Sequence, residues 1–140
     1  DNEMLDAESA KLTEAALAAM KAGDAKTFTE KFEQALRTNP GEPVTHMNYG
    51  SLLMQFAASQ PPGDNQATLL NRAEGELVTA ANMFQVNYKP KLAPIVSQTF
   101  FLLGEIQYFA RNNPAKAKSL YEQSLKLWNH AGAQEALKRY

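Results

Sequence analysis

The stretch Thr99–Leu127, TFFLLGEIQYFARNNPAKAKSLYEQSLKL, contains two apolar patterns with helical spacing, one on each side of a short polar turn. Asn113 is a favourable helix N-cap residue. Pro114 suits the first turn of a helix, because the N–H group that proline lacks would have no partner within the helix there. The stretch therefore predicts a pair of amphipathic helices.

The same order of helix, break and helix recurs along the whole chain. Breaks are predicted at Gly23-Asp24, at 39–41, at 59–63 and at 88–94, where Gly, Pro, Asn and Asp gather. We expect Asp64 to cap the helix that follows the third break. No segment has the two-residue alternation of a half-buried strand. The chain is therefore predicted to be all-α with about seven helices, over residues 1–21, 25–37, 43–58, 66–87, 94–110, 114–127 and 130–140.

Three successive segments share one pattern of large and small residues around a turn. The positions are Leu12, Ala15, Ala16, Ala19, Gly23, Asp24, Phe28, Phe32, Ala35 and Pro40, then His46, Tyr49, Gly50, Leu53, Ala73, Leu77 and Ala80, then Phe100, Leu103, Gly104, Tyr108, Ala117, Tyr121, Ser124 and Leu125. This pattern resembles the tetratricopeptide repeat (TPR), a helix-turn-helix unit with a period of about 34 residues. Phe28 departs from it, since the family prefers alanine there, and the second unit has extra residues around 58–69.

The resemblance implies an α-solenoid of stacked antiparallel helix pairs, forming a single domain over residues 1–140. Its units would span about 9–42, 43–90 and 91–128, and the helix at 130–140 would cap the last unit. Small residues should let paired helices approach closely, with large residues filling the space opposite them. The small residues are Ala16, Gly50 and Gly104, and the large ones are Phe32, Leu77 and Tyr121.

Charge and composition exclude several function classes. The net charge is −1, which gives no overall attraction to nucleic acid or anionic lipid. The chain has no cysteine, which excludes disulfides and thiolate metal sites. No apolar run is long enough to span a bilayer. Its charge is unevenly distributed, with a net of −4 over residues 1–42 and +4 over residues 91–140. We read the lysines of the last third as solvated helix faces, because no aromatic-interleaved basic stripe accompanies them.

Catalytic and metal-binding patterns are missing from the sequence, and we expect neither an enzyme nor a cofactor. No phosphate-cradling glycine loop, nucleophile elbow or HExxH motif occurs. His46 and His130 lie far apart in sequence, and we expect a packing or surface role for His46 and an exposed position for His130. The glutamates are spaced as surface charges, without an evident acid–base pair.

The resemblance to TPR proteins implies a concave groove lined by the first helix of each unit. The groove positions are Leu17, Met20, Lys21, Met47, Asn48, Ser51, Met54, Gln55, Phe101, Glu105, Tyr108 and Phe109. Family members that clamp a carboxyl terminus use lysine, asparagine and arginine at set groove positions. Asn48 matches one of these positions, but the others are occupied by Thr13, Leu17, Gln98 and Leu102, so the resemblance does not favour a carboxylate clamp. Methionine and aromatic residues suit adaptable apolar recognition. The alternative is that Met54, Phe101 and Phe109 belong to the core, beneath the last helix or the Pro61-Pro62 loop.

Two non-catalytic functions follow from this reading. The first is an interaction module whose groove binds an apolar or amphipathic peptide or helix of a partner protein. The second is a structural module that self-associates into a homo-oligomer through its oppositely charged ends. The chain begins at Asp1 rather than at methionine. A chain without an initiator methionine fits a bacterial envelope or periplasmic protein whose signal peptide has been removed, and we favour that location over the cytoplasm. A trimmed chain would begin in the same way.

Overall fold

The structure, a computed structural model, describes residues 2–140, and side chains from residue 7 onward. Within this range it is all-α. The helices are α1 (Asn2–Lys21), α2 (Ala25–Thr38), α3 (Pro43–Ala58), α4 (Asp64–Val86), α5 (Ala93–Glu105), α6 (Pro114–Leu127) and α7 (Ala131–Leu137). A 3₁₀ turn, Pro90–Leu92, precedes α5, and a π-helical turn, Ile106–Ala110, extends it. The predicted fold class and helix count are confirmed. The chain divides into two compact units, the first ending at Thr45 and the second beginning at His46, and each is described by itself.

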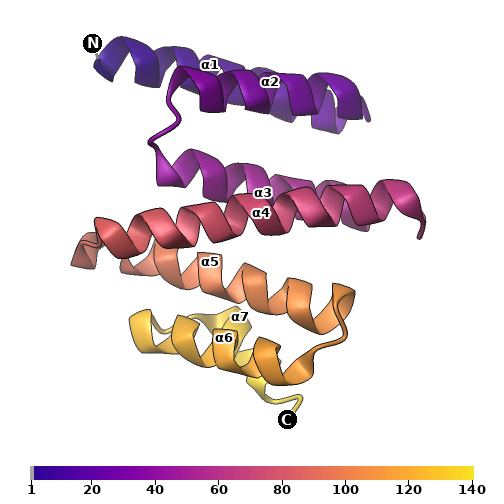
Figure 1. Cartoon of the computed structure of the whole chain (residues 1–140), viewed down its shortest axis with the longest axis vertical. Helices are drawn as coiled ribbons and strands as arrows, with labels where there is room; N and C mark the ends of the chain where they lie inside the picture. Colours follow the sequence, from indigo (N-terminus) through magenta and orange to yellow (C-terminus); the bar gives the residue numbers. More distant parts are fainter. Residues whose placement is uncertain (1) are drawn as a thin grey trace. The chain divides into compact units, whose positions relative to one another are not determined.

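The first unit is the α1–α2 pair (Figure 1). Gly23 has φ +77°, a left-handed conformation that glycine adopts without strain, and it ends the first helix as predicted. Asp24 then caps α2, its carboxylate accepting a 3.1 Å hydrogen bond from the N–H of Thr27. The fully buried Phe28 and Phe32 pack edge to face, with ring centroids 5.3 Å apart. The burial of these two rings fixes the orientation of α2.

The α3–α4 pair opens the second unit and contains the first predicted glycine contact. A Cβ atom on Gly50 would lie 2.6 Å from Cγ of Leu77, so only glycine fits there without a shift. Gln66 closes the connecting loop, its side-chain amide donating to the carbonyl of Ala57 at 2.9 Å. The prediction that Asp64 caps α4 is wrong. Gly63 occupies the N-cap with φ +154°, a backbone conformation that side chains rarely allow, and Asp64 falls in the first helical turn.

The α5–α6 pair repeats this packing. A Cβ atom on Gly104 would lie 2.6 Å from Cε1 of Tyr121, which confirms the predicted contact. Further along the pair, the buried Ser97 and Ser124 hydroxyls each donate to the other residue's backbone carbonyl at 2.8 Å. Asn113 caps α6 as predicted, accepting from the N–H of Lys116 at 3.3 Å. The pair is thus joined both by a close steric contact and by buried hydrogen bonds.

The short helix α7 packs on α6 and closes the chain. Ala133 and Ala136 are buried in a cluster with Ala117 and Tyr121. The expectation that His130 is solvent-exposed is wrong. Its Nδ1 accepts a 3.1 Å hydrogen bond from the N–H of Ala133, so His130 is itself the N-cap of α7 and is half-buried.

Candidate functional site

A pocket of about 500 Å³ lies in the second unit, where α3 ends, α4 begins and α5 passes into the π-helical turn. We call it the Phe109 pocket. Its lining consists of Met54, Ala57, Ala58, Gly63, Gln66, Ala67, Leu70, Glu105, Ile106, Phe109, Ala110 and Arg111. Most of these side chains are apolar. Several are alanines, which leave room beside the larger Met54 and Leu70.

The π-helical turn places Phe109 at this pocket. Its widened hydrogen bonding is seen where the N–H of Arg111 donates to the carbonyl of Ile106 at 3.0 Å. Such turns are rare and occur frequently at functional sites. Ile106 is buried, whereas the Phe109 side chain remains 67% exposed although it lines the pocket. Both residues line the pocket, but Ile106 belongs to the core whereas Phe109 lies at the exposed edge.

Polar contacts fix the turn against α4. Arg111 donates to the Asn71 side-chain oxygen at 2.6 Å and to Glu74 Oε1 at 2.8 Å. Gln107, which is buried, donates to the other Glu74 oxygen at 2.7 Å. Both Glu74 oxygens therefore hold the turn, and the pocket wall is tied to α4 by charge-assisted hydrogen bonds.

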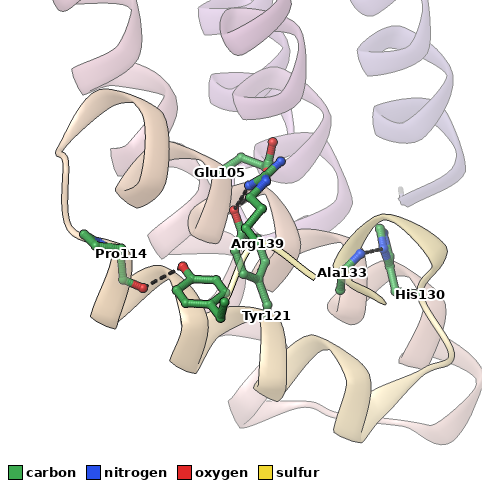
Figure 2. A network of polar contacts seen from close by, with 7 residues as sticks. Glu105, Pro114, Tyr121, His130, Ala133 and Arg139 are labelled. Atoms are coloured by element: carbon green, nitrogen blue, oxygen red, sulfur yellow. Dashed lines mark hydrogen bonds and ion pairs between the residues drawn. The ribbon is translucent and has the colours of Figure 1, made fainter. Parts of the chain in front are cut away.

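Glu105, on the last turn of α5, lines the pocket. It also lies beside Tyr121 and Arg139 (Figure 2). The Tyr121 hydroxyl donates to its Oε1 atom at 2.5 Å, and Arg139 donates to the same oxygen at 3.3 Å and to the Tyr121 oxygen at 3.2 Å. Burial, followed by the Glu105 carboxylate, raises the pKa of Tyr121 above its ordinary value. Tyr121 therefore stays protonated and continues to donate at neutral pH.

Aromatic rings complete the surroundings of Arg139. The centre of its guanidinium group lies 4.6 Å from the Tyr108 ring centroid and 4.9 Å from that of Phe109. Both distances fall within the range of cation–π attraction. Tyr140 adds a hydrogen bond from its hydroxyl to the carbonyl of Pro114 at 2.7 Å.

The predicted groove residues separate into several environments. Of the third-unit residues, Glu105 and Phe109 line the Phe109 pocket, and Met54 of α3 joins them. Phe101 and Tyr108 instead pack against the buried cluster beneath α7. The Phe101 ring stacks on His130 with centroids 4.6 Å apart. For Phe101 the alternative of a core position under the last helix therefore agrees with the structure, whereas Phe109 is exposed.

The other predicted groove residues lie outside this pocket. In α3, Met47 is buried, Ser51 is half-buried, and Asn48 and Gln55 are exposed. In the first unit, Leu17 and Met20 are half-buried and Lys21 is exposed. The sequence analysis did not identify Ile106 and Arg111 as site residues, because a 3.6-residue period does not reveal a π-helical turn. It did not identify Arg139 either, because no spacing in the sequence relates Arg139 to Glu105.

One histidine–carboxylate pair lies outside the pocket. His46 and Glu76 approach to 2.6 Å, with side chains only 11% and 12% exposed, so the prediction that the glutamates are surface charges is wrong for Glu76. Burial raises the pKa of Glu76, but the contacts from His46 and Arg72 outweigh it and lower the pKa overall. The described part of the chain contains no group of three His, Cys, Asp or Glu side chains placed to hold a metal ion. None of its helices is long and apolar enough to cross a membrane.

Comparison with known proteins supports the architecture. No protein-family model matches the chain, and no curated protein matches it. Among solved structures, the chain is similar to the N-terminal domain of stress-induced protein-1 (STI-1) from C. elegans, with a TM-score of 0.74 and 14% sequence identity. The alignment covers 99% of this chain and 98% of that chain. The fold is TPR-like. At this identity the likeness shows the fold alone.

Proposed function

We propose that this chain is a non-catalytic protein-interaction module, and that the Phe109 pocket binds an apolar or amphipathic segment of a partner protein. The observation that carries the proposal is a large aromatic side chain, 67% exposed, at the edge of an apolar pocket. Exposed apolar surface beside a pocket is typical of interaction sites. A volume of about 500 Å³ lies within the usual range for ligand pockets.

The lining suits a protein segment better than a highly polar ligand. Met54 is flexible and polarisable, so it can adapt to the shape of an incoming side chain. Ala57, Ala58 and Ala67 present little bulk, which allows a partner backbone to come close. The charged groups at the edge, Glu105 and Arg111, are already engaged within the chain. We therefore assign the binding energy chiefly to apolar contact, with Phe109 as an anchor.

The test compares two exposed aromatic residues. Phe109→Ala should weaken partner capture from the native source by about tenfold or more, because anchoring aromatic residues contribute about 2 kcal/mol or more to binding. Tyr88→Ala is the matched control, since Tyr88 is 44% exposed and does not line the pocket. Equal capture by both variants would contradict the proposal. A photo-crosslinking residue at position 109 should also link covalently to the bound segment, whereas the same residue at position 88 should not.

A second candidate is self-association. Residues 1–45, the first unit, hold five Lys/Arg and nine Asp/Glu, whereas residues 46–140 hold nine and six. The units therefore carry net charges of −4 and +3. Opposite charges would favour head-to-tail assembly, and salt would weaken it by screening. Sedimentation velocity at low and high salt tests this candidate, and a monomer under every condition would remove it.

A further inference from the structure

The side chain of Arg139 is held in a site built by the end of α5 and its π-helical turn. Glu105 supplies a carboxylate oxygen 3.3 Å from Nη1, and the rings of Tyr108 and Phe109 lie 4.6 and 4.9 Å from the guanidinium centre. Tyr108 and Phe109 are arranged edge to face, with centroids 4.9 Å apart. The Tyr121 ring lies further away, at 6.0 Å, so the guanidinium group meets one anion and has two aromatic rings as its nearest ring neighbours.

This chemistry favours arginine over lysine. A guanidinium group is planar and weakly hydrated, so it can stack on rings while donating in its own plane to a carboxylate. A lysine ammonium group is compact and strongly hydrated and gains less from the same surroundings. Glu105 Oε1 is further oriented by the Tyr121 hydroxyl at 2.5 Å. The Glu105 carboxylate is therefore held in position by Tyr121 whether or not Arg139 binds to it.

The Arg139 side chain lies outside the buried cluster beneath α7 and is held by polar and ring contacts. The helix α7 has seven residues and buries only Ala133 and Ala136 among its side chains, and Arg139 follows its end. Helices this short are marginal by themselves and depend on packing. The Arg139 side chain is 32% exposed. The Arg139 side chain can therefore leave Glu105 and the two rings without unpacking Ala133 and Ala136, and its departure would open the site.

Two residues of this site, Glu105 and Phe109, also line the Phe109 pocket. We propose that Glu105, Tyr108 and Phe109 form a guanidinium-binding site, which Arg139 occupies intramolecularly and which an arginine of the partner segment takes over. That a partner's arginine enters the site rests on the proposed function, whereas the existence of the guanidinium-binding site does not depend on it. The favoured occupant of the pocket is then an amphipathic segment with an arginine beside its apolar anchor.

The site is tested with Arg139→Ala in the whole chain and N-acetyl-argininamide as the probe. Titration followed by ¹H–¹⁵N NMR should give saturable shifts at Glu105, Tyr108 and Phe109. N-acetyl-lysinamide should bind about fivefold more weakly, as expected from the loss of stacking. The wild type and the Lys138→Ala control, in both of which Arg139 still fills the site, should respond several-fold less than Arg139→Ala. No saturable shift in a folded Arg139→Ala chain would overturn the inference.

A second variant guards against loss of folding. If Arg139→Ala unfolds α7, the titration is repeated with Arg139→Lys, in which the arginine probe should displace the weaker lysine and shift the same three amides. Adding Glu105→Gln should abolish the preference for arginine, and a preference that persists would overturn the assignment of Glu105. If the probe binds but Phe109→Ala leaves partner capture intact, the proposed function fails and the guanidinium site stands. If capture is lost but the probe does not bind, only the present inference fails.

Discussion

The α3–α4 and α5–α6 pairs each place a glycine against a large side chain of the facing helix, but they differ in what that side chain does. Leu77 fills the space opposite Gly50 and has no polar atom to satisfy. Tyr121 fills the space opposite Gly104 and also brings a hydroxyl, which donates to Glu105 and accepts from Arg139. The same packing rule therefore yields a purely steric contact in one pair and a polar network in the other. That network leads to α7 and to the pocket edge.

The largest effect is expected where glycine is sterically required. Gly104→Leu should lower the free energy of unfolding by about 3 kcal/mol, because overpacking forces side chains off their rotamers or moves the backbone. Denaturant unfolding measures the change. Gly75→Leu is the matched control, since nothing lies within 4 Å of a Cβ at this position in α4. It should be neutral or stabilise by up to about 1 kcal/mol through helix propensity. Similar losses in both variants would show that the Gly104–Tyr121 contact does not limit the packing.

The next effect isolates the hydroxyl that Leu77 lacks. Tyr121→Phe keeps the ring but removes the hydrogen bond to Glu105, and should cost about 1.5 kcal/mol as a charge-assisted bond. Because the pKa of Tyr121 is raised above 10.0 in the folded chain, its contribution is complete below pH 10 and declines as the pH rises above that value. Unfolding curves from pH 8 to 11 should therefore converge for wild type and variant. A constant difference would contradict the assigned pKa direction.

A smaller effect concerns the attachment of α7. His130→Ala should cost about 1 kcal/mol through loss of the N-cap, whereas His130→Asn should keep most of it. Burial lowers the pKa of His130 below 6.5, so the unfolded chain binds this proton more tightly. The stabilisation is thus present above pH 6.5 and is lost as the pH falls through the folded-state pKa, because protonated Nδ1 cannot accept from Ala133. The single tryptophan, Trp128, which precedes α7 by three residues, can report the change by fluorescence. An identical pH response in His130→Asn would rule out His130 as its source.

The smallest effect on stability is expected at Phe109. Because its side chain is 67% exposed, Phe109→Ala should change the free energy of unfolding by about 0.5 kcal/mol or less. Phe101→Ala should cost several times more, since Phe101 packs on Tyr121 and His130. Thermal unfolding compares the two. A large loss at Phe109 would mean that it serves the core, and would also weaken its assignment as a binding anchor.

Sequence pattern was sufficient for the fold because local signals act within a few residues. The breaks at Gly23-Asp24 and Asn113-Pro114 act through backbone conformation and capping, and both lie where they were predicted. Gly50 and Gly104 could be predicted as sites of close helix approach because small residues recur at equivalent positions of the repeat units. The cap of α4 was misplaced by one residue, since Gly63 and Asp64 are both acceptable at an N-cap and only the backbone conformation distinguishes them.

The candidate site was predicted only in part. Met54, Glu105 and Phe109 were identified as binding residues from the resemblance and do line one pocket, but Phe101 and Tyr108 were assigned to the same surface and pack beneath α7 instead. Phe101 precedes the π-helical turn, and it is covered because His130 and the cluster beneath α7 pack on it. Tyr108 and Phe109 lie within the turn, which changes the phase of the helix after Glu105, and a fixed helical period cannot anticipate that change.

The sequence by itself determined the seven helices, their breaks and the glycines at which they approach. These features depend on hydrophobic periodicity, capping and steric size, all of which are local properties. Tertiary structure alone decided that Arg139 reaches Glu105, that the His130 ring stacks on Phe101, and that Phe109 remains exposed. These outcomes depend on distances between residues up to 34 positions apart in the chain, and such distances are set by how the helices pack rather than by any pattern within one of them.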